Sequence, residues 1–315
     1  MTRSALLSGL AALLLTAASA VAQQVVDPDF RPAVERPAYT ADGPMVVIDG
    51  AHHNFHTVEG QYAPFAALLR ADGYQVRGGT APFTADGLAE IDVLVIANAG
   101  AVGPDHAAPI FTEAETAAVE AWVRGGGRLL LIADHAPFGA AAEALAARFG
   151  VRMGKGYAFA ATPDGVSTNL VYPAEAFDDH PIISGRGADE RVESVTAFTG
   201  QSLEGPEGAT VLLPMTLGAR EAANLPALQR INDRIEAGEP ADGVITELSA
   251  PALPAQALAF SHGAGRVVVL GEAGMLSAQR VRFPDGREVR FGMNVAPGNA
   301  RFGLNVLHWL TGLLP

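Results

Sequence analysis

Cysteine is absent from all 315 residues of this chain. The chain therefore forms no disulfide, has no thiolate nucleophile and offers no sulfur ligand to a metal ion. A lipid anchor attached to a modified cysteine is excluded for the same reason. Packing alone must hold the fold together, even in an oxidising compartment.

Positive charge is also scarce, because 21 lysine and arginine residues stand against 34 aspartate and glutamate residues and the formal net charge is -13. A chain of this charge repels the phosphates of nucleic acid. We therefore expect no nucleic-acid partner and favour a small-molecule ligand or substrate. The hydrophobic fraction of 49% is large enough for a sizeable core.

Long apolar runs are confined to the N-terminus, where residues 1–22 have the pattern of a signal peptide. Arg3 gives the positive start, Leu6 to Ala18 is an apolar core too short to span a bilayer comfortably, and Ala20-Val21-Ala22 is a cleavage site. We predict a periplasmic or secreted protein whose mature chain begins at Gln23. An uncleaved anchor is the alternative, and the mature chain should contain no membrane span.

After the signal peptide, residues 23–43 are rich in proline and polar residues, which predicts an extended N-terminal arm. Residues 44–315 are typical of a single domain in which apolar runs alternate with helical periodicity. The predicted strands are 45–48, 74–76, 92–97 and 128–133, and the predicted helices are 62–72, 112–124, 140–149 and 299–313. The helix over 112–124 is the best marked, because Thr112 and Glu115 have the spacing of a capping box.

This alternation predicts the fold class α/β, with a mostly parallel sheet and helices on both of its faces. Two further strands, 255–260 and 266–270, should form a hairpin. The middle of the chain, from 154 to 254, is less regular. We interpret it as β insertions around the same sheet, with a separate small lobe as the alternative.

Polar side chains follow four of the predicted strands. Asp49 follows the first strand, Asn98 follows the run DVLVIA, Asp134 follows RLLLIA, and Glu272 follows VVVLG. Ligands of open parallel sheets bind at the carboxyl ends of the strands. We therefore expect these side chains to meet at one edge of the sheet, and this convergence is the strongest functional signal in the sequence.

The loop after the first strand is rich in histidine. His52 and His56 have the H-x-x-x-H spacing, which on a helical turn places both imidazoles on one face, as in zinc sites. Together with Asp134 they could bind one divalent metal, and ligands without sulfur suit zinc, manganese or iron. His53 and Asn54 are further candidates in this loop. The alternative is that these histidines bond to loop backbone, because Gly50 and Asn54 favour a loop over a helix.

Asp134, His135 and Glu272 are the candidate catalytic residues. Asp134 could act as a base or orient an imidazole, and Glu272 could act as an acid, a base or a ligand. The structural alternatives are a helix N-cap for Asp134 and an ion pair with an arginine for Glu272. Acid/base catalysis without a metal would suit these residues equally well. The sequence contains no G-x-S-x-G nucleophile elbow and no glycine-rich phosphate loop at the relevant turns.

Several motifs together resemble a known family. They are Val47-Ile48-Asp49 with His52 to His56, Gly125 to Leu131, Asp134-His135, His180 to Gly185, and Gly265 to Glu272. In these motifs, and in their order from 45 to 313, the chain resembles the class I glutamine amidotransferase-like superfamily. The greatest likeness is to exported, largely uncharacterised relatives of its trehalose-utilisation (ThuA-like) branch.

This resemblance implies a flavodoxin-like three-layer sandwich with a site at the strand ends. The true amidotransferases of the superfamily use a Cys-His-Glu triad, and this chain has no cysteine. Glutaminase chemistry is therefore excluded, and the resemblance implies a fold more than an activity.

Two kinds of function fit these observations. The first is a hydrolase-type enzyme that acts on a small polar or carbohydrate-like substrate at the His/Asp/Glu cluster. The second is a non-catalytic module of the same fold that binds a ligand or packs against a partner. Geometry separates them, because an enzyme needs the predicted side chains close enough to share one ligand.

Overall fold

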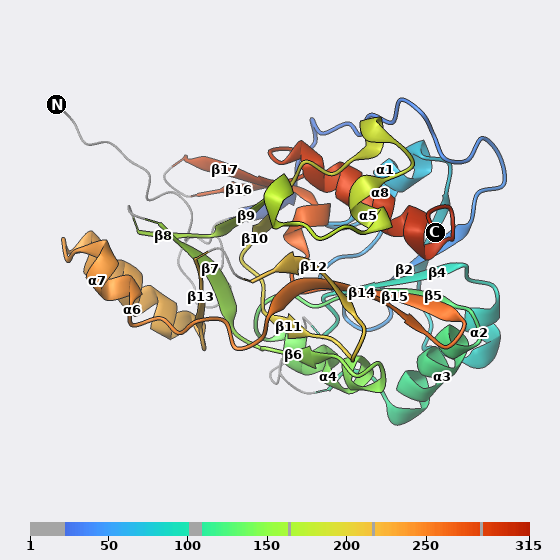
Figure 1. Cartoon of the computed structure of the whole chain (residues 1–315), viewed down its shortest axis with the longest axis horizontal. Coiled ribbons are helices and arrows are strands. Elements are labelled where there is room, and N and C mark those ends of the chain that lie inside the picture. Colours follow the sequence, from blue (N-terminus) through green and yellow to red (C-terminus); the bar gives the residue numbers. More distant parts are fainter. Residues whose placement is uncertain (1–22, 101–108, 163–164, 216–217, 284–285) are drawn as a thin grey trace.

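The computed structural model describes residues 23–100, 109–162, 165–215, 218–283 and 286–315. Its largest element is a nine-stranded sheet (Figure 1). The strands lie in the order β3 (Gln75–Gly79), β2 (Met45–Asp49), β4 (Val93–Ala97), β5 (Arg128–Ile132), β15 (Gly265–Leu270), β14 (Ala255–His262), β11 (Leu203–Glu204) and β6 (Arg152–Met153), with β12 (Thr210–Pro214) also paired to β14. The strands predicted from apolar runs are confirmed.

The sheet is mixed, which corrects the prediction of a mostly parallel sheet. Among the described strands, the pairings from β3 through β15 are parallel, and those of β14, β11, β6 and β12 are antiparallel. The reversal begins at the hairpin of β14 and β15, which was itself predicted. Short strands from the irregular middle of the chain then extend the sheet beyond β14. The fold class α/β stands.

Alternate residues of each central strand face two separate cores. In β2, Val46 and Ile48 lie in one core and Val47 lies in the other. The helices α1 (Ala63–Ala71) and α8 (Pro297–Leu310) contribute to the first core, and α2 (Ala85–Ala89), α3 (Glu113–Arg124) and α4 (Phe138–Arg148) contribute to the second. Strands that are buried on both faces carry continuous apolar runs, which explains why they could be recognised. No described helix has the length and apolarity to cross a membrane.

Part of the irregular middle forms a small unit of its own, which we call the insertion lobe. It consists of the three-stranded sheet β13-β7-β8, with β7 (Tyr157–Thr162), β8 (Gly165–Ser167) and β13 (Ala219–Ala222), and of the helices α6 (Leu225–Glu236) and α7 (Ala241–Ile245). Figure 1 shows α6 and α7 at one end of the molecule, away from the central sheet. The lobe has its own hydrophobic cluster, which also includes Ala136 from the loop after β5.

Between these parts lie the pair β9 (Asn169–Pro173) and β10 (Ser194–Phe198), the helix α5 (Pro181–Ser184), and the 3-10 turns Ala174–Ala176, Ala188–Glu190 and Gly274–Leu276. The first described residues form β1 (Gln23–Val26), which pairs with β16 (Ala278–Arg282), and β16 pairs with β17 (Glu288–Gly292). Just beyond β1, Asp27 forms an ion pair of 2.6 Å with Arg280. The beginning of the N-terminal arm is thus part of a sheet.

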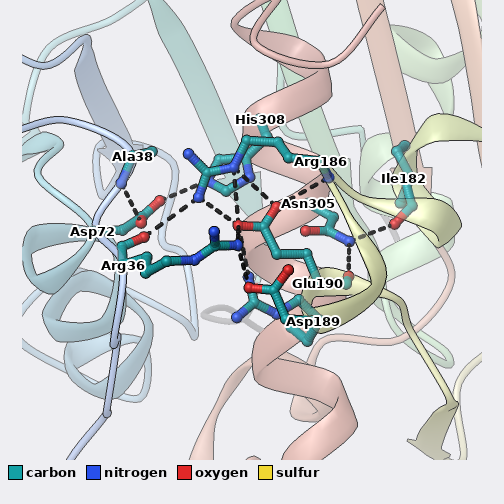
Figure 2. A network of polar contacts seen from close by, with 10 residues as sticks. Arg36, Ala38, Asp72, Ile182, Arg186, Asp189, Glu190, Asn305 and His308 are labelled. Atoms are coloured by element: carbon teal, nitrogen blue, oxygen red, sulfur yellow. Dashed lines mark hydrogen bonds and ion pairs between the residues drawn. The ribbon is translucent and has the colours of Figure 1, made fainter.

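The end of the arm is held by the buried carboxylate of Asp72, at the end of α1. The backbone N–H of Ala38 donates to Asp72 Oδ1 at 2.8 Å, and His308 Nε2 of α8 lies 2.7 Å from Asp72 Oδ2 (Figure 2). The ring of Tyr39 packs edge-on against Tyr74 at 5.0 Å. The carboxylate of Asp72 therefore connects the backbone of the arm, at Ala38, to His308 of α8.

Arg36 adds an ionic contact between the arm and the segment after α5. It pairs with Asp189, and its Nη2 lies 3.7 Å from the buried carboxylate of Glu190 (Figure 2). Glu190 also accepts hydrogen bonds from the guanidinium and the backbone N–H of Arg186. We call Arg36, Arg186, Asp189 and Glu190 the arm latch.

Candidate functional site

Four neighbouring parallel strands end at the same edge of the sheet. The strand β2 pairs with β4, β4 with β5, and β5 with β15, so that Ala97, Ile132 and Leu270 lie level with one another. Asp49 is the last residue of β2, and Asn98, Asp134 and Glu272 lie one or two residues past the ends of β4, β5 and β15. All four side chains are buried.

Asn98 connects two of these strand ends. Its backbone lies in the left-handed region, with φ of 48°. Its Oδ1 accepts the backbone N–H of Asp134 at 2.9 Å. Asp134 in turn accepts the N–H of His135 through Oδ1 at 2.7 Å. Asn98 is therefore a positioning group that fixes the start of the loop carrying Asp134 and His135.

The imidazole of His135 is held in one orientation. Its Nδ1 lies 2.7 Å from the carbonyl oxygen of Ala136, so Nδ1 carries a hydrogen and donates it. Nε2 takes no part in this bond and lies 3.9 Å from Asp134 Oδ1. The ring stacks on Tyr157 with 4.6 Å between centroids and 14° between planes.

Tyr157 is a site residue that the sequence did not reveal. It begins β7 in the insertion lobe, and its hydroxyl donates to the same carbonyl of Ala136 at 3.0 Å. Nothing in its surrounding sequence predicts a strand beside His135, because β7 pairs with strands remote from the β5 loop. The lobe thus supplies one wall of the imidazole site.

Glu272 is almost completely buried, with 1% of its surface exposed. Burial raises its pKa well above the ordinary value, and the charge of Asp134 raises it further. Hydrogen bonds from the backbone N–H groups of Gly274 and Met275 oppose this shift without cancelling it. Glu272 therefore keeps its proton to a higher pH than an ordinary carboxyl group does. The described residues include no arginine paired with Glu272.

His56 and Tyr62 complete the cluster. The two rings lie 4.6 Å apart, and the Tyr62 hydroxyl donates to the carbonyl of Ala273 at 3.0 Å. Burial lowers the pKa of His56 to about 3, with a smaller contribution from the charge of His135. His56 is therefore neutral at any pH near 7. Neither of its ring nitrogens has a hydrogen-bond partner in the described part of the chain.

His52 lies in a different environment from His56. Its Nδ1 is 2.9 Å from Asp49 Oδ2, and its Nε2 is 2.8 Å from Glu115 Oε1. Phe83 and Phe111 cover the ring, with centroids at 4.5 and 4.8 Å. Burial alone would lower the pKa of His52, but the two carboxylates outweigh it and raise the pKa. We call Asp49, His52 and Glu115 the carboxylate clamp.

The other two candidates of this loop lie nearer the surface. His53 is exposed and has a positive φ of 52°. Asn54 holds the loop in place, because its Oδ1 accepts the N–H of His52 at 3.1 Å and its Nδ2 donates to the carbonyl of Ala97 at 3.3 Å. The segment from 50 to 61 is a loop, so the H-x-x-x-H spacing does not place His52 and His56 on one helical face.

Within the described ranges, no group of three or more histidine, aspartate or glutamate side chains could hold a metal ion. A metal at His52 would have to displace Asp49 or Glu115 from a ring nitrogen. His56 alone has both nitrogens available. The metal site of His52, His56 and Asp134 stays a prediction, and His106 lies outside the described residues.

Comparisons with known proteins give structural likeness only. No family model matches the chain, and no curated protein sequence matches it. Among solved structures, the mmIFT52 N-terminal domain has a TM-score of 0.56 and 13% identity, over 85% of this chain and 97% of that domain.

Two ThuA-like proteins are also found, both with a TM-score of 0.43. The protein from Bacteroides uniformis ATCC 8492 is 14% identical over 88% of this chain and 93% of its own. The protein from Parabacteroides merdae ATCC 43184 is 10% identical over 86% of this chain and 90% of its own. At these identities, the likeness to the mmIFT52 domain shows a shared α/β fold across most of the chain, and no activity follows from it.

Proposed function

We propose that the chain is an exported hydrolase with a flavodoxin-like fold of the ThuA-like, amidotransferase-related type. Its substrate would be a small polar or carbohydrate-like molecule bound at the carboxyl edge of the sheet. The observation that supports this best is the pairing of two unlike acids, Asp134 and Glu272, beside an imidazole whose Nε2 takes no part in the bond to Ala136. A buried carboxyl group whose pKa is raised is typical of the acid in acid/base catalysis.

The roles follow from the positions of the three side chains and from the raised pKa of Glu272. His135 Nε2 takes a proton from water while the water oxygen forms its bond to the reacting carbon. Glu272 gives its proton to the leaving oxygen or nitrogen as the old bond breaks. Asp134 compensates the positive charge that develops on His135. A proton then returns from His135 to Glu272, and the site is restored.

A binding module of the same fold is the second candidate, and one observation favours it. Both oxygens of Glu272 already accept backbone N–H groups from the turn that follows, Oε2 from Met275 at 2.7 Å. Such a carboxyl group could serve chiefly to shape the turn. In that case the edge of the sheet would recognise a ligand without transforming it.

Turnover by the mature chain, residues 23–315, separates the two candidates. We would assay chromogenic glycosides, esters and amides with the wild type and with Asp134→Asn, His135→Gln and Glu272→Gln. The matched control is Asp92→Asn, because Asp92 also accepts a backbone N–H, from Met45 at 2.7 Å, but lies at the opposite end of the strands.

The hydrolase proposal expects each of the three site variants to lose at least 100-fold in turnover, a typical contribution of one acid/base group, while the control keeps full activity. No turnover by the wild type, or full activity in all three variants, would favour the binding module. Metal content of the wild type and of His56→Ala, measured alongside, tests the prediction of zinc, manganese or iron.

A further inference from the structure

His56 is a buried imidazole whose hydrogen-bonding capacity is unused by the protein. It is 3% exposed, and both Nδ1 and Nε2 lack a partner among the described residues. Two other described histidines are buried and differ from His56, because His52 bonds through both ring nitrogens and His308 bonds to Asp72 through Nε2, although its Nδ1 also lacks a partner among the described residues. Burying an unpaired polar group destabilises a fold. A group kept in this state is therefore a candidate for binding something other than the protein.

The position of His56 puts it in the proposed site. Its ring packs on Tyr62, whose hydroxyl bonds to the residue that follows Glu272. His56 is thus on the same edge of the sheet as the candidate catalytic residues.

The strand-end segments contain no lysine or arginine side chain. No lysine or arginine occurs in residues 49–69, 93–123, 133–147 or 267–279, which include the ends of β2, β4, β5 and β15. An anionic ligand would therefore meet Asp134 with no lysine or arginine of these segments to balance its own charge.

We propose that His56 is a ligand-binding residue of this site and that the ligand is uncharged, with a hydroxyl or amide group that bonds to the ring. A neutral imidazole presents one N–H donor and one lone-pair acceptor, and a hydroxyl or amide can satisfy both kinds. A neutral ligand would thus supply the hydrogen bonds that the His56 ring lacks in the folded protein. This inference relies on the proposed function only for the location of the site.

The test compares two substitutions of His56. His56→Leu removes both hydrogen-bonding atoms and keeps an apolar side chain, whereas His56→Gln retains one donor and one acceptor. We would measure the thermal midpoint of each mature protein and the binding of neutral D-glucose and N-acetyl-D-glucosamine by calorimetry. D-gluconate and glucose 6-phosphate are the anionic comparisons.

We expect His56→Leu without ligand to melt a few degrees above the wild type, because an unpaired buried group has been removed. Its binding of the neutral probes should fall at least tenfold, and His56→Gln should recover most of it. The anionic probes should bind the wild type at least tenfold more weakly than the neutral ones. A lower midpoint for His56→Leu, equal binding by wild type and His56→Leu, or no binding of either neutral probe would overturn the inference.

Asp134→Asn separates this inference from the proposed hydrolase. If the wild type binds the neutral probes through His56 but shows no turnover, the inference stands and the hydrolase fails. If Asp134→Asn loses turnover while binding does not depend on His56, the hydrolase stands and the inference fails.

Discussion

The carboxylate clamp should be a large contributor to stability, and His52→Ala tests this directly. The side chain of His52 is 7% exposed, and those of Asp49 and Glu115 are 0% and 10% exposed, so solvent screens their interactions weakly. Removing one partner of a buried charged pair typically costs about 3–5 kcal/mol. Without His52, Glu115 keeps its hydrogen bonds from Thr112, and Asp49 keeps, among the described residues, the N–H of Ala51. We therefore expect His52→Ala to lower the free energy of unfolding by about 3–5 kcal/mol.

The contribution of the carboxylate clamp to stability should depend on pH in a way that identifies His52. The folded state raises the pKa of His52, so its stabilising contribution is complete below the unfolded value of about 6.5. It is lost as the pH rises through the higher folded pKa. The wild type should therefore lose stability with rising pH above about 6.5, and His52→Ala should lack this component.

His180→Ala is the control, because His180 is a partly buried histidine that bonds to backbone and not to a carboxylate. It accepts the N–H of Ile182 at 3.1 Å and caps α5, so its loss should cost about 1 kcal/mol. Burial, with a smaller contribution from the charge of Arg266, lowers the pKa of His180. Its contribution is therefore present above a pH of about 6.5 and is lost as the pH falls, the opposite trend to that of His52.

Urea unfolding of the three proteins between pH 5.5 and 9 measures both effects. The reasoning would be refuted if His52→Ala cost less than about 1 kcal/mol, well under the range for a broken buried pair. It would also be refuted if His52→Ala kept the same loss of stability above pH 6.5 as the wild type.

Four further substitutions test the site, the arm and a tight turn. Tyr157→Phe keeps the ring that stacks on His135 and should leave turnover within about twofold of the wild type. Tyr157→Ala removes that ring and should lower kcat at least tenfold. Steady-state kinetics would resolve this difference. Glu190→Gln removes the buried charge of the arm latch and should both lower the thermal midpoint and speed protease cleavage within residues 23–43. Gly127→Ala would place a Cβ 2.3 Å from the Trp122 ring and should cost about 1–3 kcal/mol in urea unfolding, while an unchanged midpoint would contradict the packing.

The sequence predicted the central strands well and the insertion lobe poorly, for physical reasons. The strands β4 and β5 are buried on both faces, so each is a continuous apolar run flanked by turn residues. The helix α3 has the capping box that Thr112 and Glu115 predicted. In contrast, β7 and β13 pair with each other across about sixty residues and are only partly buried. The sequence near each strand does not predict a pairing over such a distance. For this reason Tyr157 could not be identified from the sequence as a site residue.

The two histidines of the H-x-x-x-H motif show why spacing alone does not define a site. The spacing treats His52 and His56 as equivalent, but their chemistry depends on partners that lie far away in the sequence. His52 bonds to Glu115, 63 residues away, because β2 ends beside the first turn of α3. His56 meets Tyr62 and the charge of His135 instead, and no carboxylate bonds to it. Carboxylate partners hold the first ring in place as a structural cation, and their absence leaves the second ring neutral and available to a ligand. Whether a histidine stabilises the fold or recognises a ligand is thus decided by tertiary contacts, which the motif does not encode.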